Sequence, residues 1–218
     1  MSGRFQEARA RLAEARLYVV SADGPPGFQA DVLCAAVDGG AGLVQLRNKQ
    51  AQPAELLDAA RRVGAHARAH GAVFIVNDSP ELVSASGADG VHVGQQDGEM
   101  AEVRGRLPAG ALVGRSTHSI SQIEGAHQEG ADYIGVGPVH ATPTKPGRAP
   151  VGLELVRLAV AAARLPWFAI GGIDAGNIGA VLEAGARRVA VVRAVALAPD
   201  PRAATAELLA ALGAGIAV

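Results

Sequence analysis

The segment 135–147 has the composition best suited to bind an anion. This stretch, GVGPVHATPTKPG, follows the apolar run YIGV. Its glycines and prolines stop both helix and strand, so we expect an ordered loop at the end of a strand. Thr142 and Thr144 supply hydroxyl donors, Lys145 supplies a positive charge, and Gly137 lets a ligand approach the backbone. The loop therefore suits a phosphorylated small molecule, and the alternative interpretation is a proline-rich surface turn.

A second group of candidate residues combines both signs of charge. Arg47 and Lys49 are positive, Asp78 and Asp97 are negative, and Asn77 adds an amide oxygen. Arginine binds a diphosphate through paired hydrogen bonds, and lysine neutralises it as a point charge. One or two carboxylates, together with substrate phosphates, commonly bind Mg²⁺. The group therefore predicts a Mg²⁺–diphosphate site with one ion, although either aspartate alone could equally be a helix N-cap.

The glycine pair Gly171 and Gly172 precedes an expected helix that begins at Asp174. Such a pair lets a phosphate approach the backbone N–H groups at a helix N-terminus. Close packing of the strand against the helix would explain the same two glycines equally well.

These residues lie at the ends of short aliphatic runs that alternate with helical patterns. The expected strands are 16–22, 43–46, 73–76, 90–93, 112–114, 133–136, 167–170 and 188–192, and the expected helices are 3–15, 29–38, 54–70, 80–86, 99–107, 119–128, 153–164, 174–184 and 201–212. Near-continuous aliphatic strands are typical of a parallel sheet that is buried on both faces. Eight such units in 218 residues predict a single (β/α)₈ TIM barrel, an α/β fold, with an extra helix at 1–15 and the barrel at 16–218.

An open doubly wound sheet is the alternative fold, but no GxGxxG follows the first strand. A barrel places its active site at the carboxyl ends of its strands. The segments QLRNK, ND, QQD, RSTH, TPTK, GG and VVR should then meet at one mouth.

Composition narrows the classes of function. Hydrophobic residues make up 49% of the chain and charged residues 19%, which allows a sizeable core. The net charge of −1 argues against general nucleic-acid binding. No apolar run approaches the length of a membrane span, and the amphipathic start of the chain is unlike a signal peptide. Cys34 is the single cysteine, which excludes a disulfide framework and favours a cytoplasmic location. A homo-oligomer is compatible with the sequence.

Several segments together resemble the thiamine phosphate synthase family. They are QLRNK at 45–49, ND at 77–78, GVHVGQQD at 90–97, GRSTH at 114–118, DYIGVGPVHATPTKPG at 132–147 and AIGGI at 169–173. The resemblance covers nearly the whole chain in the same order. The family is a group of Mg²⁺-dependent transferases that join a hydroxymethylpyrimidine diphosphate to a thiazole phosphate, releasing pyrophosphate and forming thiamine phosphate.

The resemblance implies a role for each matching position. The residues matched to the pyrimidine diphosphate are Gln45, Arg47, Lys49, Asn77, Ser116 and Lys145. Those matched to the thiazole phosphate are Thr142, Thr144, Gly172, Val192 and Arg193. Asp78 and Asp97 match the Mg²⁺ ligands, and Lys145 and Ser116 are expected to be catalytic. The family's reaction is dissociative: diphosphate leaves first, and the thiazole nitrogen attacks the pyrimidine methyl cation.

Three positions depart from the family pattern. Asn48 replaces a common Asp, Ser79 replaces an Arg that often follows ND, and Arg193 replaces a common Ser. Losing the arginine at 79 removes a charge, whereas Arg193 adds one beside the expected thiazole phosphate.

Other functions remain open. A thiazole tautomerase, a barrel relative of the synthase, would use an acid–base residue such as His118, and a non-catalytic precursor-binding barrel would bind without turnover. A phosphosugar isomerase or aldolase would need a base or a lysine inside the barrel, and Lys49 and Lys145 both belong to expected loops. His66 and His70 share a helical face that could bind a metal, but we favour a solvated face.

Overall fold

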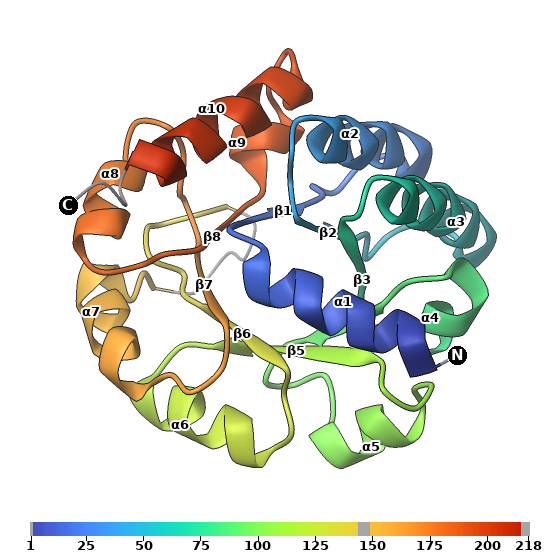
Figure 1. The fold of residues 1–218 in the computed structure, drawn as a ribbon, viewed down its shortest axis with the longest axis horizontal. Helices are drawn as coiled ribbons and strands as arrows, with labels where there is room; N and C mark the ends of the chain where they lie inside the picture. The colour runs from blue at the N-terminus through green and yellow to red at the C-terminus, as the bar shows by residue number, and fades with distance from the viewer. Residues whose placement is uncertain (1, 144–148, 215–218) are drawn as a thin grey trace.

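Over residues 2–143 and 149–214, which this computed structural model describes, eight parallel strands close into a barrel in chain order (Figure 1). The strands are β1 (Leu17–Val20), β2 (Leu43–Leu46), β3 (Val73–Asn77), β4 (Gly90–Val93), β5 (Leu112–Thr117), β6 (Tyr133–Val136), β7 (Trp167–Ile170) and β8 (Val189–Val191). β8 pairs with β1, with Leu17 opposite Val189. The predicted barrel is confirmed.

The helices surround the strands, apart from α1, which lies across the end of the barrel (Figure 1). They are α1 (Ser2–Glu14), α2 (Pro26–Asp38), α3 (Pro53–Ala69), α4 (Glu81–Ser86), α5 (Met100–Gly105), α6 (Ile120–Gln128), α7 (Gly152–Ala162), α8 (Ile178–Glu183), α9 (Arg193–Ala196) and α10 (Pro201–Ala214). α2 and α3 begin with proline, which preorganises the first helical turn. Ser119 caps α6, since its hydroxyl accepts a hydrogen bond from the Gln122 N–H.

Three element boundaries differ from expectation by three residues or more, and several others differ by one or two. The first is the start of α2, which lies at Pro26 and not at position 29. β5 extends to Thr117, because Arg115, Ser116 and Thr117 continue the register with β6. α8 begins four residues later than expected. The Asp174 carboxylate instead accepts hydrogen bonds from the backbone N–H groups of Gly176 (2.9 Å) and Asn177 (3.2 Å), which forms a turn before the helix.

The interior of the barrel is closed at its amino end by α1. Leu12, which is 1% exposed, packs with Ala8 and Ala15 against the side chains that fill the barrel, among them Tyr18 and Leu43. In Figure 1 this helix lies across the ring of strands. Polar contacts hold it there: Arg9 pairs with Asp132, Arg4 with Asp89 at 3.1 Å, and Arg188 donates to the carbonyls that end α1. The carboxyl end of the barrel is the end left to form a site.

No helix in the described part of the chain is long and apolar enough to span a membrane.

Candidate active site

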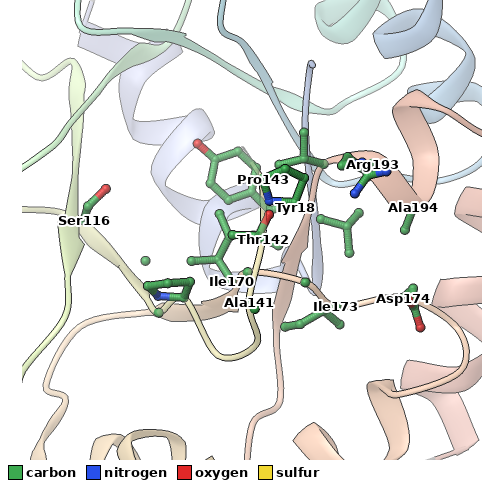
Figure 2. A pocket seen from close by; sticks show the side chains of 18 of the residues that line it. Tyr18, Ser116, Ala141, Thr142, Pro143, Ile170, Ile173, Asp174, Arg193 and Ala194 are labelled. Atoms are coloured by element: carbon green, nitrogen blue, oxygen red, sulfur yellow. The ribbon is translucent and has the colours of Figure 1, made fainter. Parts of the chain in front are cut away.

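A cavity of about 440 Å³ lies at the carboxyl ends of the strands. This volume falls in the range of small-molecule sites. Six residues predicted from sequence line it, namely Gln45, Ser116, Thr142, Gly172, Val192 and Arg193. In Figure 2, Arg193 and Thr142 lie on one side of the cavity and Ser116 on the other. The side with Arg193 suits an anion, and the apolar side chain of Ile170 contributes to the wall between the two sides.

The loop after β6 is held against the end of β7 by backbone hydrogen bonds. The N–H of Val139 donates to the Ile170 carbonyl at 2.8 Å, and the N–H of His140 donates to the Gly171 carbonyl at 2.9 Å. Gly172 has a φ of 64°, and a Cβ there would lie 2.8 Å from the Cβ of His140. Glycine is therefore required for this approach. Close packing is the structural role of the pair, and it brings Thr142 and Gly172 to the same cavity.

β8 leads directly into α9, which the sequence analysis did not predict. Val192 is its N-cap residue and Arg193 its first residue, and both line the cavity. The region after strands seven and eight, with a short extra helix, is where this fold frequently binds phosphate. α9 spans four residues, too few to show a helical repeat in the sequence.

The predicted metal ligands lie together near the carboxyl ends of β3 and β4. Asp78 follows β3 with a φ of 58°, a conformation that is uncommon for a residue other than glycine. Burial raises the pKa of the Asp78 carboxyl, and the neighbouring Asp97 carboxylate raises it further, whereas Lys49 opposes both effects. The Lys49 Nζ lies 3.2 Å from Asp78 Oδ2. Two adjacent carboxylates with partial burial form a donor set that fits a hard divalent cation.

Arg115 fixes the loop that carries Asp97. Its side chain is buried, and its NH1 donates to the carbonyls of Gly94 (2.9 Å) and Gly98 (3.2 Å), which bracket Asp97 in sequence. The Asp97 carboxylate also accepts a hydrogen bond from the Gly94 N–H at 2.7 Å. The position of Asp97 is therefore set by β5 as well as by its own loop.

The loop after β2 is organised by two side chains. Arg47 is buried, and its NH1 donates to both carboxylate oxygens of Asp23 at 3.0 and 3.1 Å. Asn48 accepts hydrogen bonds from the N–H groups of Gln50 and Ala51 and donates to the Gly24 carbonyl. Asn48 thus has a structural role in the turn.

A buried chain of hydrogen bonds leads from Ser116 into the barrel. The Ser116 hydroxyl lies 3.0 Å from His92 Nε2, His92 Nδ1 lies 3.2 Å from the Tyr133 hydroxyl, and that hydroxyl lies 3.1 Å from the Tyr18 hydroxyl. Burial raises the pKa of both tyrosines, so they stay neutral. A Cβ at Gly114 would lie 2.2 Å from the Tyr133 ring and 2.4 Å from His92 Nδ1. Glycine at 114 makes this arrangement possible.

Neither His92 nor Tyr18 was among the site residues predicted from sequence. Both line the cavity, together with His118, whose Nδ1 donates to the Gly137 carbonyl. The signal for His92 was its position one residue before the end of β4, because alternate strand residues face the barrel interior.

The predicted residues form two neighbouring groups. The cavity lining does not include Arg47, Lys49, Asn77, Asp78 and Asp97. Two hydrogen bonds that link the groups run from Gln45 Nε2 to Asn77 Oδ1 at 3.3 Å and from the Asp78 N–H to the His92 carbonyl at 2.9 Å. Thr144 and Lys145 lie outside the described residues.

Comparisons with known proteins identify the family of the chain. A family model described as thiamine monophosphate synthase matches residues 17–195. A thiamine-phosphate synthase of Gloeobacter violaceus is 49% identical over 209 residues, covering 96% of this chain and 61% of that protein. One from an Arthrobacter species is 47% identical over 232 residues, covering 95% of this chain and 98% of that protein.

Solved structures give the same result. The thiamine phosphate pyrophosphorylase of Pyrococcus furiosus superposes with a TM-score of 0.84 at 31% identity, covering 95% of this chain and 98% of that one. A 3-hexulose-6-phosphate synthase, with a TM-score of 0.63 and 22% identity, shares the fold alone.

Proposed function

The chain belongs to the thiamine monophosphate synthase family, and we propose from this that it is a transferase that forms thiamine phosphate. The substrates would be a hydroxymethylpyrimidine diphosphate and a thiazole phosphate, and the second product would be pyrophosphate. The observation that carries the proposal is the pairing of Asp78 and Asp97 beside Lys49, next to a cavity that Arg193 and Thr142 line. The first group suits a diphosphate with its cation, and the second suits a phosphate.

Asp78 and Asp97 are the residues that would hold one Mg²⁺, which when bound would offset the charge on the departing diphosphate. Lys49 and Arg47 add positive charge on the same side. Arg47 has NH1 engaged with Asp23, and its remaining N–H groups are of the kind that bind phosphate oxygens.

The cavity residues would position the two reacting atoms. Gln45 and Ser116 would orient the pyrimidine, while Thr142, Arg193 and the backbone at Gly172 would hold the thiazole phosphate. The bond between the pyrimidine methylene carbon and the diphosphate oxygen breaks, and its electron pair leaves with diphosphate. The thiazole nitrogen then donates its lone pair to form the new C–N bond. Holding both partners in one cavity lowers the entropic part of the barrier.

Two further features remain predictions. They are the cytoplasmic location expected from the single cysteine, and the catalytic roles of Lys145 and Ser116 that the family resemblance implies. The sequence is compatible with a homo-oligomer.

The test is a coupling assay with both substrates, in Mg²⁺ or in EDTA, with thiamine phosphate and pyrophosphate quantified. We expect equal amounts of both products, lost in EDTA. Asp78→Asn and Asp97→Asn should each lower turnover by about 100-fold or more, because each removes charge that the cation requires. Asp58→Asn, which changes an exposed carboxylate on α3, is the matched control and should match the wild type.

Full turnover in EDTA would contradict the metal assignment, while formation of no product from both substrates in Mg²⁺ would contradict the synthase itself. In the second case the next hypotheses to test are a thiazole tautomerase and a non-catalytic precursor-binding barrel, with His118→Asn as the first variant.

A further inference from the structure

We propose that Asp38, His66 and His70 form a second cation site, separate from the cavity, for a first-row transition metal such as Zn²⁺. Asp38 is the last residue of α2, and His66 and His70 occupy the last turn and the C-cap of α3. One ligand atom from each residue lies within 4.8 Å of the other two. Two neighbouring helices thus supply three ligands from segments that are 28 residues apart in the chain.

The spacing of the ligand atoms is close to what a tetrahedral ion requires. With metal–ligand distances near 2.0–2.1 Å, two ligands of one zinc ion lie about 3.3 Å apart. His66 Nε2 lies 2.7 Å from Asp38 Oδ1, and His70 Nε2 lies 3.8 Å from the same oxygen. Both distances come within about 0.6 Å of that value, a change that side-chain rotation alone can supply. All three side chains are partly exposed, so an ion has access and water can complete its coordination.

The orientation of His70 is that of a metal ligand. Its Nδ1 lies 2.9 Å from the His66 carbonyl oxygen. A carbonyl can only accept a hydrogen bond, so Nδ1 carries a proton, and in the neutral ring Nε2, the atom that faces Asp38, presents the lone pair that a metal binds. Histidine ligands usually have their second nitrogen fixed in this way. The two rings are stacked, with centroids 4.2 Å apart and planes inclined by 25°, which directs both Nε2 atoms to one carboxylate.

The donor set separates this site from the Asp78–Asp97 pair. Imidazole nitrogen with one carboxylate suits zinc and its neighbours in the transition series, whereas magnesium prefers oxygen ligands. Cys34 lies one helical turn before Asp38, and burial raises the pKa of its thiol, with the charges of Asp31 and Asp38 adding to the rise against the effect of Arg62. A protonated thiol is a poor ligand, so His and Asp supply the site.

The site would stabilise the fold rather than take part in the reaction. In a (β/α)₈ barrel the helices run antiparallel to the strands, so helix C-termini lie at the end opposite the active site. α2 and α3 lie side by side in Figure 1, and a shared ion at their C-terminal ends would join them. The partial negative charge of both helix C-termini also favours a cation there.

The experiment uses the full chain without a polyhistidine tag, stripped of metal and kept in excess Mg²⁺ so that the oxygen-rich site is occupied. Zn²⁺ binding is measured by calorimetry, and Co²⁺ is used as a visible-absorption probe of imidazole coordination. We expect His66→Gln, His70→Gln and Asp38→Asn each to weaken one Zn²⁺ site by at least about tenfold. His127→Gln changes an exposed histidine on α6 and, with Cys34→Ser, is a matched control that should bind as the wild type does.

A second measurement is the unfolding midpoint, which Zn²⁺ should raise in the wild type and in His127→Gln but not in His70→Gln, because only the folded form brings the helices together. Thiamine phosphate formation should be unchanged in all the histidine variants, so the two proposals fail separately. Equal Zn²⁺ affinity in His66→Gln, His70→Gln and the wild type would overturn the site, as would loss of binding in Cys34→Ser.

Discussion

Ser116 shows how a single polar residue near the cavity is fixed by residues that do not themselves bind phosphate. Its hydroxyl meets His92 Nε2, and the opposite nitrogen of that ring meets Tyr133. The chain is buried, so each member depends on its neighbour for a hydrogen bond. Because burial keeps the tyrosines neutral, we infer that they hold the His92 ring by hydrogen bonds and that this ring orients Ser116.

Replacing His92 should therefore lower turnover more than it lowers binding. His92→Phe removes the partner of Ser116, and we expect kcat to fall about tenfold, the equivalent of one buried hydrogen bond. His92→Gln keeps a polar end group near Ser116 and should recover part of the loss. Steady-state kcat and KM for each substrate, with unfolding midpoints for both variants, distinguish positioning from simple destabilisation. Equal kcat for His92→Phe and wild type would refute the role.

At this scale the sequence identified residue types at strand ends but not how they pair. Gln45, Ser116, Thr142 and Arg193 could be placed because each follows or ends an aliphatic run. The Tyr18–Tyr133 contact joins residues 115 positions apart, and both look like ordinary core aromatics. Arg47 and Asp23 likewise pair across two loops that no local pattern connects.

Among the elements, the loop between β4 and α5 depends on β5 for its shape. Arg115 reaches back from β5 to two carbonyls of this loop, and Gln95 in the loop donates to the Ser116 carbonyl at 2.6 Å. The loop is therefore hydrogen-bonded to β5 both before and after Asp97 in the chain.

Removing the hydrogen bonds of Arg115 should raise the Mg²⁺ concentration that turnover requires. In Arg115→Met the apolar stem remains, but the two carbonyls lose their donor, so Asp97 is no longer held beside Asp78. We expect the Mg²⁺ concentration for half-maximal turnover to rise about tenfold or more. The measurement is turnover against Mg²⁺ concentration, with Arg106→Met as the control, since the Arg106 side chain is exposed and pairs with Glu81. An unchanged Mg²⁺ requirement would show that the loop keeps its shape without Arg115.

Element prediction succeeded where aliphatic residues fill a strand, and it failed where a strand ends in polar residues or a helix has a single turn. The strands at 43–46, 90–93, 133–136 and 167–170 agree with the structure to the residue. The end of β5 was missed because Arg115, Ser116 and Thr117 are polar, yet they are buried against β6. α9 was missed because one helical turn leaves no repeat to detect.

At the scale of the whole molecule, α1 completes a core that the strands leave open. The residues inside the barrel form a cluster distinct from the aliphatic layer between strands and helices. Leu12 is the α1 side chain that packs deepest against it.

Truncating this side chain should cost stability and leave the reaction intact. Leu12→Ala is expected to reduce the free energy of unfolding by about 2–5 kcal/mol, since it opens a cavity in a filled interior. Turnover should stay near the wild-type value below the unfolding transition, because the change lies at the end opposite the cavity. Urea unfolding gives the free energy, and Leu158→Ala, at a leucine that is 45% exposed, is the control. Similar losses of unfolding free energy in Leu12→Ala and Leu158→Ala would contradict the conclusion that α1 closes the barrel interior.

The closed amino end of the barrel also determines the route by which substrates and products reach and leave the cavity. Since side chains fill the barrel axis up to α1, nothing can pass through the barrel, and molecules arriving at the cavity must depart from the same face. Pyrophosphate and the larger product would share one exit with the incoming substrates. A product that stays in the cavity blocks binding of the next substrates. The order of product release, and not only bond formation, therefore limits turnover in a barrel that is open at one end.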